Sequence, residues 1–163
     1  MATQEDFTAE LTVRPEDEYR TATLRDKHTL FSDEPAWLPS GLAGNDDHPA
    51  PVDYLMMSLA TCQVSVLRQC LERNSVEEYQ IDCEAILDEY DREEDLPDEM
   101  PRHTALRIGH ITVEMALKTT PEYADSADQC LITYDDGCIV GQSISGGIDY
   151  TPLTSLEVVE PPL

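Results

Sequence analysis

Residues 51–73 read PVDYLMMSLATCQVSVLRQCLER, and this stretch decides the fold. Pro51 suits the first position of a helix, and Asp53 lies in the first turn, where the helix dipole favours an acid. Because this is the least polar segment of the chain, we predict a central helix rather than a surface helix. Its apolar residues recur at helical spacing: Val52, Leu55, Met56, Leu59, Val66, Leu67 and Cys70.

Segments of alternating polarity on both sides of this helix predict strands. Upstream, Phe7, Ala9, Leu11 and Val13 alternate with polar residues, which predicts a half-buried strand. Two further strands are predicted before the helix and three after it, over residues 19–24, 28–32, 79–87, 104–118 and 155–160.

Two local signals refine the second half of the chain. The apolar residues of the strand 104–118 change parity at Gly109, which predicts a β-bulge. Thr120 and Pro121 predict the start of a second helix, with Thr120 as its N-cap, and Gly146-Gly147 its end. One face of that helix carries Ala127, Leu131, Tyr134 and Cys138.

The resulting order is β-β-β-α-β-β-α-β with short links, which predicts an α+β fold with a largely antiparallel sheet. The chain has 163 residues, a length typical of one domain, so we expect a single domain over residues 1–163.

Charge excludes two classes of partner. The chain has 34 acidic residues against 10 Lys and Arg and a formal net charge of −24, and such a surface repels nucleic acid and anionic lipid. Only Lys27 and Lys118 are lysines, and an acidic, lysine-poor surface is typical of proteins from salt-loving organisms. The alternative is a docking face for a basic partner. The acids are spread along the chain, with one dense run at residues 91–99, and this favours a solvated surface.

We also expect no membrane span and a cytoplasmic location. The most apolar stretch, residues 55–60, is far shorter than the roughly 20 residues that a span requires. The N-terminus has neither the basic nor the apolar region of a signal peptide.

Five cysteines are present, and their odd number in a chain of this size does not predict a disulfide scaffold. Their spacing contains no Cys-x-x-Cys or Cys-x-x-His, so no zinc site is expected. Cys70, Cys83 and Cys130 are interpreted as buried core residues. Cys62 and Cys138 differ, because each lies on the apolar face of one predicted helix, and packing of the two helices could bring the thiols together.

Two motifs around Cys62 and Cys138 resemble those of the OsmC/Ohr family. The first runs from Asp33-Glu34-Pro35 through a glycine-bearing loop to Pro49-Ala50-Pro51 and ends at Leu59-Ala60-Thr61-Cys62. The second is Gly137-Cys138-Ile139-Val140, followed by Ser145-Gly146-Gly147-Ile148. The resemblance extends over residues 19–159.

This resemblance implies an OsmC-like homodimer of intertwined antiparallel sheets around two central helices. The family includes thiol-dependent peroxidases that reduce organic hydroperoxides. In these members the residue matching Cys62 is oxidised to a sulfenic acid, and the residue matching Cys138 condenses with it to a disulfide, which an external dithiol reduces. The resemblance implies no other cofactor.

The chain departs from the peroxidase pattern at three points. Val52 stands where those members have a glutamate, and Asp53, nine residues before Cys62, falls near the opposite side of the helix. Ile139 stands where many members have proline. Those members also use an arginine to hold the first cysteine as thiolate. No arginine lies between Arg25 and Arg68, so Arg14 and Arg20 are the N-terminal candidates.

Two functions follow as hypotheses. The first is a thiol peroxidase acting through Cys62 and Cys138, with Arg14, Arg20 or Asp53 as further candidates. The alternative is a non-catalytic or redox-sensing OsmC-like dimer that binds a small apolar ligand between its helices.

Overall fold

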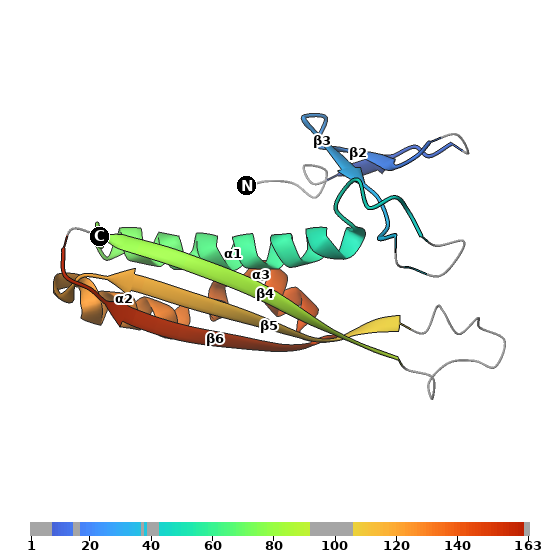
Figure 1. Cartoon of the computed structure of the whole chain (residues 1–163). Coiled ribbons are helices and arrows are strands. Elements are labelled where there is room, and N and C mark those ends of the chain that lie inside the picture. Colours follow the sequence, from blue (N-terminus) through green and yellow to red (C-terminus); the bar gives the residue numbers. More distant parts are fainter. Residues whose placement is uncertain (1–7, 15–16, 37, 39–42, 92–105, 162–163) are drawn as a thin grey trace. The chain divides into compact units, whose positions relative to one another are not determined.

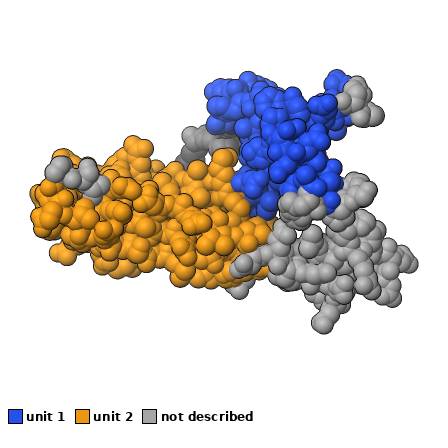
Figure 2. All heavy atoms as spheres, in the orientation of Figure 1, with its two compact units in different colours: residues 1–55 blue, residues 56–163 orange. Residues whose placement is uncertain are grey.

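A computed structural model describes residues 8–14, 17–36, 38, 43–91 and 106–161. The chain divides into two compact units, residues 1–55 and residues 56–163 (Figure 2). Each unit contains one three-stranded sheet, and the boundary between the units falls in the first turns of the long helix α1.

Unit 1 is built on the antiparallel sheet β1-β2-β3, with strands β1 (Ala9–Leu11), β2 (Arg20–Leu24) and β3 (His28–Ser32). The turn after β2 contains Arg25 and Asp26, both with positive φ. All three residues of β1 are exposed, so the prediction of a half-buried strand is wrong for its described residues. An alternating strand buries one side only where a second layer covers it. Phe7, which belonged to that prediction, lies outside the described residues.

Helix α1 (Pro51–Arg73) has the predicted bounds. At its start the carboxylate of Asp53 accepts a hydrogen bond from the backbone N–H of Ala50 at 2.7 Å, which satisfies a donor near the helix N-terminus. Four residues at intervals of four are buried along the helix: Leu59, Gln63, Leu67 and Leu71.

Unit 2 contains the sheet β4-β5-β6, formed by β4 (Tyr79–Asp91), β5 (Leu106–Thr119) and β6 (Asp149–Val158). The β4–β5 pair is antiparallel, and its register passes from Asp88↔His110 to Glu89↔Ile108. Gly109 is therefore the extra residue, and the predicted bulge is confirmed. β6 pairs parallel to β5, because the chain between these two strands crosses over through helices (Figure 1). Most of the acidic run 91–99 lies outside the described residues.

The second helical region is broken, which corrects the prediction of one continuous helix. It consists of the 3₁₀ turn η4 (Pro121–Tyr123), helix α2 (Ala124–Thr133), the 3₁₀ turn η5 (Asp135–Gly137) and helix α3 (Ile139–Ile144). Thr120 occupies the N-cap position of η4, but its side chain makes no capping hydrogen bond. The break falls where Gly137 lies against α1: a Cβ at Gly137 would approach Val66 Cγ1 to 2.7 Å.

The core of unit 2 lies between its sheet and its helices. Residues of β5 that share one face, Met115 and Leu117, pack with Leu67 and Leu71 of α1. The face predicted for the second helical region is buried in full, at Ala127, Leu131, Tyr134 and Cys138. Among the described helices, none is long and apolar enough to cross a membrane.

Candidate functional site

Cys62 and Cys138 lie together in one apolar cluster of unit 2. Cys62 is in the middle of α1 and half-buried, whereas Cys138 is fully buried at the N-cap of α3. Leu59, Ile111 and Val113 complete the buried part of this cluster. Both cysteines are free thiols. The structure therefore places in one cluster the two cysteines that the sequence analysis selected.

The surroundings of Cys138 keep its thiol protonated. The pKa of Cys138 is raised to about 11, mainly by burial and to a smaller extent by the neighbouring thiol of Cys62. The backbone N–H of Gly141 opposes this effect, since it donates a hydrogen bond to Cys138 Sγ at 3.2 Å and so favours the thiolate. Burial is the largest cause, and at neutral pH the proton stays on Cys138.

Two contacts beside the cysteines join α1 to η5. Gln63, which follows Cys62 and is fully buried, donates a hydrogen bond from Nε2 to Asp135 Oδ1 at 3.0 Å. Val66 packs against Gly137, the residue before Cys138, so closely that no Cβ fits there. These contacts position the segment that carries Cys138 against the turn of α1 that carries Cys62.

Sequence reasoning missed two polar residues of this region. Gln63 lies four residues from both Leu59 and Leu67 and therefore on the apolar face of the helix. A polar residue on that face is the signal that could have identified it. Tyr134 was read only as a core residue. Its buried hydroxyl has no hydrogen-bond partner within the described residues, and burial raises the pKa of Tyr134 to about 12.

Cys70 and Cys130 form a disulfide, and this corrects their interpretation as core residues without a partner. They are 60 residues apart in sequence, with a Cα–Cα distance of 5.7 Å, and link α1 to α2. The side-chain amide of Asn74 lies 3.5 Å from both sulfur atoms, so they also have a polar neighbour. The pairing was not readable from one segment, because it depends on the antiparallel packing of two helices. Cys83 is a free, partly buried thiol, and burial raises its pKa.

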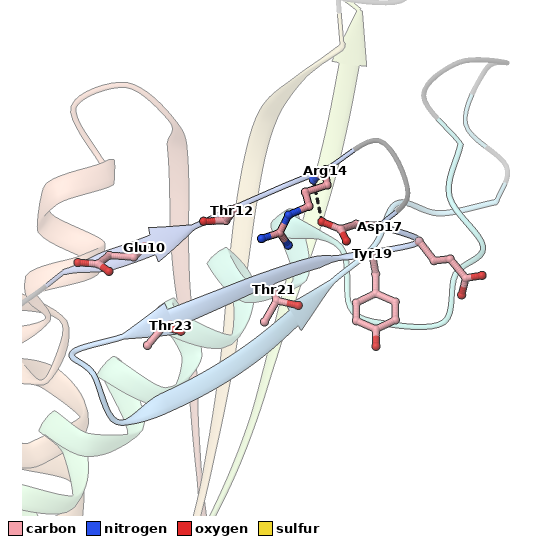
Figure 3. A pocket seen from close by; sticks show the side chains of 8 residues that line it. Glu10, Thr12, Arg14, Asp17, Tyr19, Thr21 and Thr23 are labelled. Atoms are coloured by element: carbon pink, nitrogen blue, oxygen red, sulfur yellow. Dashed lines mark hydrogen bonds between the residues drawn. The ribbon is translucent and has the colours of Figure 1, made fainter.

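The two candidate arginines belong to unit 1. Arg20 forms an ion pair with Glu34 at 3.0 Å. Arg14 lines a pocket of about 550 Å³ beside β1 and β2, and its backbone N–H donates to Asp17 Oδ2 (Figure 3). The residues lining this pocket are polar, acidic or aromatic apart from Arg14, and none is a cysteine. Asp53 is engaged at the start of α1 by the N–H of Ala50.

Comparisons with known proteins identify the family and the fold of this chain. A family model described as OsmC-like protein matches residues 44–152, a range that includes Cys62 and Cys138. A search of curated protein sequences found no significant match.

Several solved structures share the fold at low sequence identity. An OsmC-like protein from Mycoplasma pneumoniae matches with a TM-score of 0.67 and 12% identity, over 95% of this chain and 99% of that one. An organic hydroperoxide resistance protein from Legionella pneumophila matches with a TM-score of 0.60 and 14% identity, over 91% and 97%. The organic hydroperoxide resistance protein OhrB of Bacillus subtilis matches with a TM-score of 0.54 and 17% identity, over 91% and 98%. Together with the family model, which covers more than half of the sequence, the α+β architecture places this chain in the OsmC-like family.

Proposed function

We propose that this protein is a thiol peroxidase that reduces organic hydroperoxides. The observation that carries the proposal is the pair of free thiols, Cys62 and Cys138, which pack together inside one apolar cluster. The names of the similar structures from Legionella pneumophila and Bacillus subtilis support the choice of organic hydroperoxides as substrates.

The reaction divides the work between the two cysteines. The Cys62 thiolate attacks one peroxide oxygen, the O–O bond breaks, and the products are a Cys62 sulfenic acid and, after protonation, an alcohol. Cys138 then attacks the sulfenic sulfur, and a Cys62–Cys138 disulfide forms with release of water. An external dithiol returns both cysteines to thiols and leaves as its own disulfide. The buried, protonated state of Cys138 suits the resolving thiol, because it does not compete with Cys62 for the peroxide.

Arg20 is the stronger of the two candidates for stabilising the Cys62 thiolate. Its guanidinium is held by the carboxylate of Glu34, whereas the Arg14 side chain lines a pocket of polar residues. A guanidinium held in place loses less conformational freedom when it binds a thiolate. Arg20→Ala should therefore slow the oxidation of Cys62 by tert-butyl hydroperoxide more than Arg14→Ala does. Asp53 belongs to the helix start and has no part in the proposed reaction.

We also propose that the protein is a homodimer. Large apolar side chains are exposed on both units, among them Leu11, Val13 and Phe31 in unit 1 and Met57 on α1. Covering them in an obligate dimer would bury more than about 2,000 Å². Light scattering in molar salt should give twice the mass of the chain, and a monomeric mass would contradict the dimer.

The peroxidase proposal is tested by two cysteine variants that should fail differently. Cys62→Ser should abolish reduction of tert-butyl hydroperoxide by a dithiol. Cys138→Ser should allow one turnover and then leave a Cys62 sulfenic acid, which a dimedone probe traps and excess peroxide over-oxidises. Cys83→Ala is the matched control and should retain activity. If the peroxide leaves Cys62 and Cys138 of the reduced wild type unoxidised, the peroxidase proposal fails and the non-catalytic or redox-sensing alternative replaces it.

A further inference from the structure

The two cysteine pairs lie on one helix–helix interface. Cys70 follows Cys62 by eight residues on α1, and Cys130 precedes Cys138 by eight residues on the opposing segment. The two segments run antiparallel, so the pairs Cys62/Cys138 and Cys70/Cys130 lie one after the other along the same interface. The Gln63–Asp135 hydrogen bond and the Val66–Gly137 contact lie between them.

We propose that the Cys70–Cys130 disulfide is a positioning element that holds Cys62 and Cys138 in the register needed to form their own disulfide. A role for this disulfide in catalysis rests on the proposed function. The effect of one disulfide on the formation of the other does not depend on it. The protein would then contain two disulfides with different roles. The external dithiol reduces Cys62–Cys138 in each catalytic cycle, whereas Cys70–Cys130 stays oxidised and positions the two helices.

The distance between the two cysteine pairs excludes direct thiol–disulfide exchange between them. Eight helical residues span about 12 Å along the axis, whereas thiol–disulfide exchange requires contact between the attacking thiolate and a sulfur of the disulfide. Cys70–Cys130 therefore acts on Cys62 and Cys138 through the placement of the helices.

The path of the chain shows how this placement is transmitted. Cys130 lies near the end of α2, and only Tyr134 and the three residues of η5 separate that helix from Cys138. A shift of α2 along α1 therefore moves Cys138 relative to Cys62. A disulfide forms only when its two Cβ atoms come within about 4 Å, so a small shift lowers the effective concentration of the resolving thiol.

The two contacts between the cysteine pairs add to the coupling of the pairs but cannot replace a covalent bond. A Gln–Asp hydrogen bond contributes only about 1 kcal/mol net, and Gly137 offers no side chain to interlock with Val66. The covalent link at Cys70–Cys130 adds a constraint on the register of α2 to the apolar packing of Leu67 and Leu71 with Ala127 and Leu131.

Redox equilibration with glutathione tests the proposal. Each protein disulfide forms as two thiols lose two protons and two electrons, which oxidised glutathione accepts to become two molecules of reduced glutathione. In the Cys70→Ala/Cys130→Ala variant, the equilibrium constant for Cys62–Cys138 formation should fall about tenfold relative to the wild type, within the usual range of allosteric coupling. Alkylation of free thiols followed by peptide mass spectrometry measures both pairs, and Cys83→Ala is the control with one core thiol removed.

A reciprocal measurement keeps the proposal testable if that variant does not fold. Coupling is mutual, so removing Cys62–Cys138 with Cys138→Ser should lower the equilibrium constant for Cys70–Cys130 by the same factor. Equal constants in variant and wild type, in either arm, would overturn the proposal. Because no hydroperoxide is used, coupling can be found in a protein that fails the peroxidase assay, so the two failures are distinguishable.

Discussion

At the scale of single residues, the buried thiol of Cys138 makes stability depend on alkaline pH. Its pKa is raised to about 11 in the folded protein, above the ordinary value of 9.0, mainly by burial. The folded state therefore keeps a proton that the unfolded state loses, and the stability present below about pH 9 is lost as pH rises towards 11. The shift corresponds to about 2–3 kcal/mol.

The test is the free energy of unfolding of the reduced protein, measured in urea from pH 8 to pH 11. Wild-type stability should fall with pH more steeply than that of Cys138→Ala. Tyr134 and Cys83 are present in both proteins, and Cys138 is only the smallest of the causes that raise the pKa of Tyr134. Parallel curves would show that Cys138 titrates normally.

A second prediction at this scale concerns Gly137. Its missing side chain lets η5 approach Val66, since a Cβ there would lie 2.7 Å from Val66 Cγ1. Gly137→Ala should destabilise the fold by about 1–3 kcal/mol through overpacking. It should also slow disulfide formation between Cys62 and Cys138. Adding Val66→Ala should recover part of both losses, as a double-mutant cycle measures.

A matched control exists in the same region of the chain. A Cβ at Gly146 would meet nothing within 4 Å among the described residues. Gly146→Ala should therefore change stability little. A loss as large as that of Gly137→Ala would mean that backbone freedom, and not the contact with Val66, explains the effect.

At the scale of elements, Asp33 organises the loop between β3 and α1. Its nearly buried carboxylate accepts hydrogen bonds from the backbone N–H groups of Glu34, Asn45 and Asp47. The bond from Glu34 is the main cause that lowers the pKa of Asp33, and the other backbone bonds add to it. The stability that this loop provides is therefore present above the ordinary carboxyl pKa of 3.8 and is lost as pH falls through the lowered folded value.

Asp33→Asn should loosen this loop at neutral pH, because an amide group would point one N–H donor at backbone donors. Limited proteolysis should cut the variant within residues 33–49 faster than the wild type. Asp46→Asn is the control, since Asp46 is exposed and its positive φ suits asparagine. Equal cleavage rates for the wild type and Asp33→Asn would contradict this role.

At the scale of the whole molecule, charge should make stability depend on salt. The formal net charge is −24, and the screening length shortens from about 30 Å at 0.01 M salt to about 3 Å at 1 M. The midpoint of thermal unfolding should therefore rise across this range. A flat series would mean that the acids are compensated by ion pairs or by a basic partner, as the alternative interpretation of the charge holds.

The sequence by itself determined the features that depend on near neighbours. Helical periodicity with Pro51 at the start placed α1 at its observed bounds, and the parity change at Gly109 located the bulge. The apolar face from Ala127 to Cys138 was also readable, and it is buried even though the helix that carries it is broken. Periodicity reports which side of an element faces the core, and that information is local.

Only the tertiary structure decided which distant residues meet. The break at Asp135–Gly137 falls where Gly137 approaches Val66, and the pairing of Cys70 with Cys130 depends on the antiparallel register of two helices. Likewise, β1 alternates as a half-buried strand does, but its exposure depends on whether another layer covers it. These features arise from contacts between residues far apart in sequence, and no local pattern encodes the partner.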